Sequence, residues 1–261
     1  MNGFRVMWIY FRVGAMNEMQ YRVNFFLQLL QSTIAIGTGL IALTLVYSYT
    51  DELGGWSSPE LLAVLGVYTL MGGVIKAFIQ PNMERIMGDV QEGTLDFALT
   101  KPEDSQLIVS VREIRIWQTV DILLGLILLS VAVYQLQMGL GLVEALAFVA
   151  SLLLGGIMIY SFWLMLTTIA FWAVRIHEMV NLFQGLFQAG RFPVDIYPLW
   201  LETSLTFLVP IAFAITVPAE ALTGRLTPQT LLGALALALV LFTLARIFWR
   251  RGLRQYSGAS A

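Results

Sequence analysis

The chain has 261 residues, of which 58% are hydrophobic and 12% are charged, and its formal net charge is −2. A soluble domain carries about 25% charged residues, so this composition excludes a soluble globular protein and indicates that lipid is the solvent. The chain contains no cysteine and a single histidine, His177, which excludes a disulfide framework and leaves little for metal or triad chemistry. We therefore expect neither a catalytic site nor a metal site.

Residues 1–24 mix apolar side chains with Arg5, Arg12 and Arg22. These charges are spread too evenly for a cleavable signal peptide. The pattern favours an amphipathic helix that lies on the inner membrane surface, with Trp8 at headgroup level. Such a helix is either a plain anchor or a lever that couples an intracellular partner to the first span.

Seven long uncharged stretches follow, at residues 25–50, 61–75, 122–143, 145–174, 179–190, 203–219 and 226–245. A spanning helix needs about 20 apolar residues, and the stretch at 203–219 is short and contains two prolines. Seven crossings would also place the arginine-rich termini on opposite sides, against the positive-inside rule. An even number of crossings is therefore expected.

The sequence thus predicts an all-α integral membrane protein that forms one transmembrane domain over residues 1–261. Its six predicted spans lie at about residues 25–49, 60–80, 116–137, 145–171, 174–193 and 226–247. Because the number of crossings is even and the stretch is short, residues 198–220 are predicted to form a re-entrant helical element before the last span. Its non-helical backbone is allowed at membrane depth where protein or water covers it. A fully spanning, merely kinked segment is the alternative.

This topology places both termini in the cytoplasm. The protein is expected in the plasma (inner) membrane of the cell. Acidic residues dominate its predicted outer loops, where Arg191 and Arg225 are the only cations among Asp51, Glu52, Glu60, Glu144, Asp195, Glu202 and Glu220. Lysine and arginine are in excess on the predicted inner side. The charge distribution therefore agrees with the orientation, although acidic residues count for little in the rule.

The main cytoplasmic loop is predicted at residues 80–115. Pro81 is expected to end the second span, and Asn82 is expected to cap a short helix that Gly93 then breaks. Leu95, Phe97 or Ala98, and Leu99 give the next short piece an apolar edge. That edge suits docking into a groove on a partner, although an ordinary solvated loop has the same composition.

The segment after the fifth predicted span contains several glycine and proline residues that end, begin or interrupt helices. Gly190 and Pro193 end that span at the outer face, Tyr197 suits the interface, and Pro198 suits the first turn of a new helix. Pro210 removes one backbone hydrogen bond in mid-segment.

Polar residues inside the spans are the remaining candidates for a pathway. In the first span these include Gln28, Gln31 and Thr38, which either line a path or hydrogen-bond a neighbouring helix. Lys76 is the best intramembrane charge, although it lies close enough to the inner boundary to snorkel, and Asp121 lies at a span end. The sequence has no phosphate-binding loop and no hydrolase motif, so any ATPase must be another chain.

Two stretches make the chain resemble the membrane permease subunits of type-2 ABC exporters, over nearly its whole length. One is Glu92-Gly93-Thr94-Leu95-Asp96 followed by Leu99-Thr100-Lys101-Pro102, and the other is Gly190-Arg191-Phe192-Pro193 followed by Tyr197-Pro198-Leu199-Trp200-Leu201 and Val209-Pro210. Tyr21-Arg22-x-Asn24 and the pair Pro210 and Pro218 are similar to a bacterial subgroup with poorly assigned substrates. The substrate class and the identity of the partner permease stay open.

The resemblance implies that two permeases, identical or sister chains, pack together in lipid and bind two ABC ATPase subunits. ATP and magnesium would bind to those ATPases and no cofactor to this chain, and no nucleic acid is expected as a partner. The implied ATPase-coupling residues are Glu84, Arg85, Glu92, Gly93, Thr94, Leu95, Asp96, Leu99 and Pro102. The implied outer gate comprises Gly190, Phe192, Pro193, Tyr197, Pro198, Pro210 and Pro218. The rival hypotheses are an ATP-independent channel or ion-coupled carrier, and an integral membrane enzyme.

Overall fold

The computed structural model describes residues 8–9, 12–14, 16, 18, 22–100, 104–137, 141–172 and 177–256. Most of the predicted inner-surface helix at residues 1–24 lies outside this part of the chain, as do Lys101, Pro102 and Glu103, so that helix stays a prediction. Every regular element among the described residues is helical. The chain is an all-α protein, as its composition predicts.

The helical elements follow one another from the N-terminal side to the C-terminal side. They are α2 (Arg22–Tyr47), α3 (Ser58–Val74), η1 (Ile75–Ile79), α4 (Gln80–Gln91), α5 (Asp96–Leu99), α6 (Ser105–Val109), η2 (Ile116–Gln118), α7 (Thr119–Leu136), α8 (Leu142–Thr168), η3 (Ile169–Phe171), α9 (His177–Ala189), η4 (Val194–Ile196), α10 (Leu199–Thr203), η5 (Ser204–Leu208), η6 (Ala212–Thr216), α11 (Val217–Leu222) and α12 (Pro228–Gln255).

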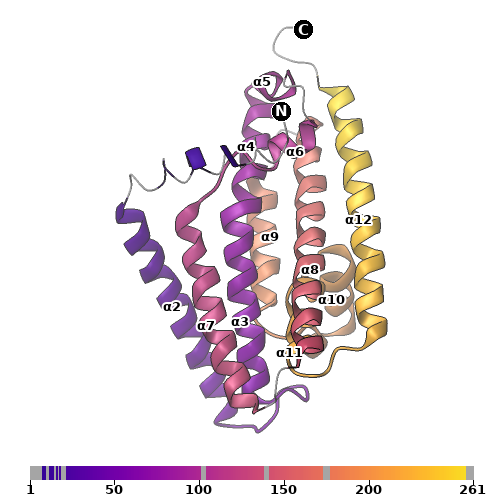
Figure 1. Cartoon of the computed structure of the whole chain (residues 1–261). Helices are drawn as coiled ribbons and strands as arrows, with labels where there is room; N and C mark the ends of the chain where they lie inside the picture. Colours follow the sequence, from indigo (N-terminus) through magenta and orange to yellow (C-terminus); the bar gives the residue numbers. More distant parts are fainter. Residues whose placement is uncertain are drawn as a thin grey trace.

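Five helical stretches among the described residues are long and apolar enough to cross a membrane: Val23–Tyr47, Ser58–Gln91, Ile116–Leu136, Leu142–Phe171 and Pro228–Gln255. They run side by side as a bundle, with α4, α5, α6 and the last turns of α12 at one end (Figure 1). Helix α9 runs along the bundle with 13 residues, and residues 173–176 before it are not described. The predicted fifth span at 174–193 therefore stays a prediction.

Helix α3 is the centre of the bundle, and it is mostly buried, whereas the other long helices leave most of their surface exposed. Its tightest neighbour is α7. A Cβ atom added at Gly125 of α7 would lie 2.6 Å from the backbone N of Leu70, and one added at Gly73 would lie 2.8 Å from the backbone N of Ile122. Small residues thus allow the two backbones to approach closely, which is how helices associate in lipid.

The second span does not end at Pro81, contrary to the sequence-based expectation. The helix continues from α3 through the π-helical turn η1 into α4 as far as Gln91. Pro81 lies in the first turn of α4, where its missing N–H removes no essential bond, and the wider turn before it accommodates the ring. Asn82 is not a cap: its side chain bonds both the N–H (2.8 Å) and the carbonyl (2.8 Å) of Glu113.

The segment before α12 is a bent pair of short helices, Leu199–Leu208 and Ala212–Leu222, which meet at 77°. Pro210 lies in the break between them, where a residue without an N–H cannot continue a helix. Trp56 Nε1 donates to Asp195 (2.9 Å) just before the pair, and Arg225 Nε donates to Glu60 (2.8 Å) just after it. Both ends of the pair therefore lie at the same end of the bundle (Figure 1), which agrees with a re-entrant element.

Candidate functional site

A cavity of about 330 Å³ lies between α2, α3 and α9. Its lining consists of Gln28, Gln31, Ser32, Ala35, Ile36, Leu65, Tyr68, Thr69, Gly72, Ile75, Lys76, Gln80, Asp121, Phe183, Gln184, Phe187, Gln188 and Arg191. This mixture of aromatic, amide and charged groups is unusual inside an apolar bundle. Polar side chains that face a cavity at membrane depth mark candidate pathways, so this cavity is the first candidate site.

Asp121 is the centre of the polar end of this cavity. Its side chain is 8% exposed, and its Oδ1 accepts hydrogen bonds from Ser32 Oγ and from Gln28 Nε2 (3.2 Å). Its Oδ2 accepts from Lys76 Nζ (3.3 Å). A buried carboxylate is stable in such a place only when donors and a cation surround it. Gln118 extends the cluster by donating to Gln28 Oε1 (2.8 Å).

An aromatic wall forms the other side of the cavity. The rings of Tyr68 and Phe187 stack with their centroids 5.1 Å apart, and those of Phe183 and Phe187 stack at 5.9 Å. The guanidinium carbon of Arg191 lies 5.5 Å from the centroid of the Tyr68 ring. This arrangement places a cation over an aromatic face, which is an attractive contact.

The structure brings together some of the predicted path residues and leaves one out. Gln28, Gln31 and Lys76 line the cavity. Thr38 does not line it, because its hydroxyl donates to the Ala35 carbonyl (2.8 Å) on an exposed part of α2. In lipid, a threonine satisfies its own hydroxyl in this way when no partner helix is near.

Sequence reasoning missed Asp121 as a cavity residue, and also the aromatic wall. Asp121 begins a span, and position alone gave no reason to pair it with Ser32 or Lys76, which lie in other helices. A usable signal for α9 was the spacing of Phe183 and Phe187, which places both on one helix face. Nothing in the sequence indicated which helix that face would meet.

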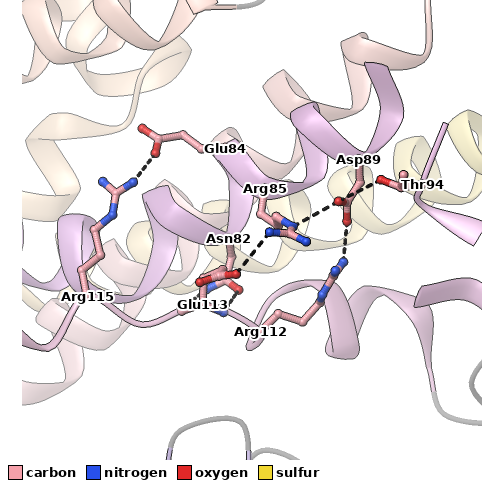
Figure 2. A network of polar contacts seen from close by, with 8 residues as sticks. All are labelled: Asn82, Glu84, Arg85, Asp89, Thr94, Arg112, Glu113 and Arg115. Atoms are coloured by element: carbon pink, nitrogen blue, oxygen red, sulfur yellow. Dashed lines mark hydrogen bonds and ion pairs between the residues drawn. The ribbon is translucent and has the colours of Figure 1, made fainter. Parts of the chain in front are cut away.

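A second polar cluster lies at the end of the bundle that carries α4, α5 and α6, and Asp89 is its centre (Figure 2). The Asp89 carboxylate, 4% exposed, accepts from Arg112 Nη1 (2.6 Å) and from Arg85 Nε (3.1 Å). The hydroxyl of Thr94 donates to the same carboxylate (3.3 Å). The backbone carbonyl of Asp89 also accepts from the N–H of Thr94 (2.8 Å). This residue therefore holds the end of α4, the turn after it and residue 112 in one arrangement.

The predicted coupling residues Glu84 and Arg85 belong to this cluster and are engaged within the chain. Glu84 pairs with Arg115 (2.7 Å), and Arg85 lies 3.8 Å from Glu113 as well as bonding Asp89 (Figure 2). Both side chains thus fasten the return segment 110–118 to α4. They support the loop from within, and their role toward a partner stays a prediction.

The tip of the loop follows α4. Gly93 has a φ of 71°, a left-handed conformation that favours glycine, and α4 ends just before it. Leu95 is fully buried and Leu99 is half-buried, whereas Phe97 is 77% exposed. The expected apolar edge is therefore wrong for Leu95, which packs into the core, whereas Phe97 of the same edge faces outward.

Acidic side chains accompany Phe97 at this tip: Glu92 is exposed and Asp96 is partly exposed. The tip thus presents one aromatic ring and two carboxylates. The predicted coupling residue Pro102 lies outside the described residues.

A third contact ties α6 to the last helix. Arg246 of α12 donates to Asp104 (2.8 Å) and to Gln106 (2.7 Å). The bonds from the Arg246 guanidinium lower the pKa of Asp104 to about 2. Asp104 also accepts from the N–H of Leu107 (3.2 Å) as the cap of α6. The loop is therefore fastened at both of its sides, by Asp89 to α4 and by Asp104 to α12.

The predicted outer-gate residues lie where α9 passes into the bent helix pair. A Cβ atom added at Gly190 would lie 2.3 Å from Ile215 Cδ1, so α9 approaches η6 closely there. The Tyr197 hydroxyl donates to the Ala189 carbonyl (2.8 Å). The remaining members punctuate this region: Phe192 packs against the core, Pro193 precedes η4, Pro198 precedes α10, Pro210 lies in the break and Pro218 lies in the first turn of α11.

A bundle of helices that are long and apolar enough to cross a membrane defines a multi-pass membrane protein, and this bundle holds a polar cavity. A family model described as ABC-2 family transporter protein matches residues 33–260, and the chain belongs to this family. It is a membrane permease of the type-2 ABC class, a non-catalytic transporter component. No curated protein sequence matches the chain. Family membership favours this class over a lone channel or carrier and over a membrane enzyme.

Proposed function

We propose that this permease forms the translocation path of an ATP-driven exporter together with a second permease, and that separate ATPase subunits supply ATP and magnesium. One observation carries the proposal. The continuous helix from Ser58 to Gln91 lines the cavity with Tyr68 and Lys76 and leads directly into the exposed tip at Glu92–Phe97. A motion of the tip is transmitted to the cavity wall through this helix, because Asp89 holds the turn at Gly93 against the end of α4.

The clusters at Asp89 and Asp104 support this coupling, because they hold the loop against α4 and α12. A partner that docks on Phe97, Glu92 and Asp96 moves the loop together with these helices. ATP drives transport by shifting the population between two transporter states, and it must therefore bind these states with different affinities. Under the proposed topology the tip lies in the cytoplasm together with both termini, and the protein resides in the plasma membrane.

The exposed apolar surface of the bundle supports the proposal of a second permease. Helices α2 and α9 flank the cavity and expose large apolar side chains, including Phe26 (66%), Ile34 (58%) and Leu182 (66%). These surfaces face lipid or a second permease. A wall contributed by a second permease completes the path that one chain leaves open on this side.

Co-purification tests the proposal directly. The tagged protein is extracted gently from its native membrane, with and without cross-linking, and the accompanying chains are identified by mass spectrometry. We expect an ABC ATPase at an equal amount, and a sister permease if the transporter is heteromeric. If no ATPase accompanies the protein even after cross-linking, the exporter proposal is wrong.

A further inference from the structure

We propose that the cavity between α2, α3 and α9 binds an amphipathic organic anion that carries an aromatic or other planar apolar group. This inference rests on the proposed function, because it names the substrate class of the same site. Two features of the lining carry it: the charged side chains that remain free to pair with a ligand, and the aromatic wall that lines the same cavity.

The single carboxylate of the lining is already satisfied within the chain. Both oxygens of Asp121 accept hydrogen bonds, one from Ser32 and Gln28 and the other from Lys76, and its side chain is 8% exposed. An organic cation would need a carboxylate with free acceptor capacity. Asp121 accepts three hydrogen bonds and its charge is already balanced by Lys76, so it offers an organic cation no unpaired negative charge.

The two cations of the lining retain capacity for a ligand. The side chain of Lys76 is 51% exposed, and its ammonium carries three donors, of which Asp121 takes one at 3.3 Å. Arg191 has no ion-pair partner among the described residues, and it contacts the Tyr68 ring. With two cations against one satisfied carboxylate, the lining has a net positive charge.

The aromatic wall lines the same cavity as these cations. Tyr68 and Lys76 are eight residues apart on one continuous helix, so about 12 Å separates them along the axis. Tyr68 stacks on Phe187, and Arg191 lies over the Tyr68 ring. An aromatic ligand that packs beside Tyr68 and Phe187 therefore lies near the guanidinium of Arg191, with the ammonium of Lys76 farther along the same helix.

The remaining polar lining and the size of the cavity fit this ligand. The amide side chains of Gln31, Gln184 and Gln188 donate and accept hydrogen bonds without adding charge. A volume of about 330 Å³ lies at the lower end of pockets that bind drug-sized molecules, about 300–1,000 Å³. The size of the cavity thus favours a small ligand over a long polymer.

A matched pair of probes tests the charge preference. The native complex in lipid nanodiscs is titrated with tritiated naphthalene-2-sulfonate and with tritiated 2-naphthyltrimethylammonium, which share a ring and differ in charge. Binding is measured by scintillation proximity, with the same amount of empty nanodiscs as background. The variants are Lys76→Gln, which keeps a donor for Asp121, Lys76→Arg, Arg191→Gln, and the control Arg250→Gln on an exposed turn of α12.

We expect the sulfonate to bind at least about tenfold more tightly than the ammonium compound, because the cations of the lining attract the sulfonate and repel the ammonium group. Lys76→Gln should weaken sulfonate binding about tenfold and Arg191→Gln severalfold, whereas Lys76→Arg and Arg250→Gln should retain it. Equal or tighter binding of the ammonium compound overturns the inference. So does sulfonate binding that is absent, or that is unchanged in both cavity variants.

The same preparation separates this inference from the exporter proposal. Mass spectrometry of the nanodisc sample shows whether an ABC ATPase is present, independently of which probe binds. Anion binding without an ATPase would uphold the ligand class and reject the exporter proposal. An ATPase with cation binding would do the reverse.

Discussion

Arg225, which follows α11, forms a two-point ion pair with Glu60 in the first turn of α3, with Nε to Oε1 at 2.8 Å and Nη2 to Oε2 at 2.9 Å. The Arg225 guanidinium also lies 4.6 Å from the centroid of the Trp56 ring, and Trp56 in turn donates to Asp195. The start of the central helix thus holds both ends of the bent helix pair. A shift of α3 is therefore transmitted to the proposed outer gate.

The first prediction concerns this ion pair. In the single variants Arg225→Gln and Glu60→Gln and in the double variant, we expect a coupling energy of about 1–3 kcal/mol, because the pair is bidentate and half-buried. Unfolding in a denaturing-detergent titration gives the free energies of the double-mutant cycle. If the two single effects simply add, the two residues do not act together.

The second prediction concerns the contact between α8 and the bent helix pair. A Cβ atom added at Gly155 would lie 2.5 Å from the Phe213 carbonyl oxygen and 2.6 Å from Ala214 Cα, whereas one added at Gly156 meets nothing within 4 Å. Gly155→Ala should therefore lower the free energy of unfolding by about 1–3 kcal/mol through overpacking. Gly156→Ala is the matched control and should be neutral or slightly stabilising. Equal effects of the two substitutions would contradict the packing seen here.

The third prediction concerns Asp89. The variant Asp89→Asn leaves the partly buried Arg112 without its carboxylate, so we expect a loss of about 1–3 kcal/mol in local stability. Hydrogen exchange of residues 92–113 measures this loss directly. Glu92→Gln, at an exposed position of the same loop, is the control and should leave exchange unchanged. Unchanged exchange in Asp89→Asn would show that the loop is held by other contacts.

The fourth prediction tests the exposed tip. Under the proposed function, Glu92→Lys, Asp96→Lys and Phe97→Ala should weaken ATPase association and uncouple ATP hydrolysis from transport. Their own folding should change little, because none of these side chains is buried. Glu52→Lys, in an exposed loop at the opposite end of the bundle, is the matched control. Normal ATPase association and transport in all three tip variants would remove the docking assignment.

The fifth prediction concerns pH. Because Arg246 holds the pKa of Asp104 at about 2, below the ordinary value of about 3.9, this contact contributes stability above about pH 4 and loses it as the pH falls toward 2. Protease sensitivity of the loop should therefore be constant between pH 5 and 8. Asp104→Asn should raise that sensitivity throughout the same range. A change in protease sensitivity with a midpoint between pH 5 and 8 would mean that another titratable group controls the contact.

The sequence by itself determined the class of protein and the main spans. Long apolar stretches and a low charge content require lipid as solvent, and a chain in lipid must satisfy its backbone bonds within helices. These are local properties, and they are readable from composition and from runs of residues. Pro210, in mid-segment, likewise predicted the break before α12 for a local reason, its missing N–H.

Only the tertiary structure decided which side chains meet. Asp121 is one carboxylate at a span end until Gln28, Ser32 and Lys76 surround it from two other helices. Pro81 was misread because its effect depends on the π-helical turn before it and on the packing of α4. Leu95 faces inward because the Asp89 cluster folds the turn back onto the core. For Asp121 the deciding energy is a contact between residues distant in sequence, and for Pro81 and Leu95 it is the packing of a turn, and helical periodicity contains no information on either.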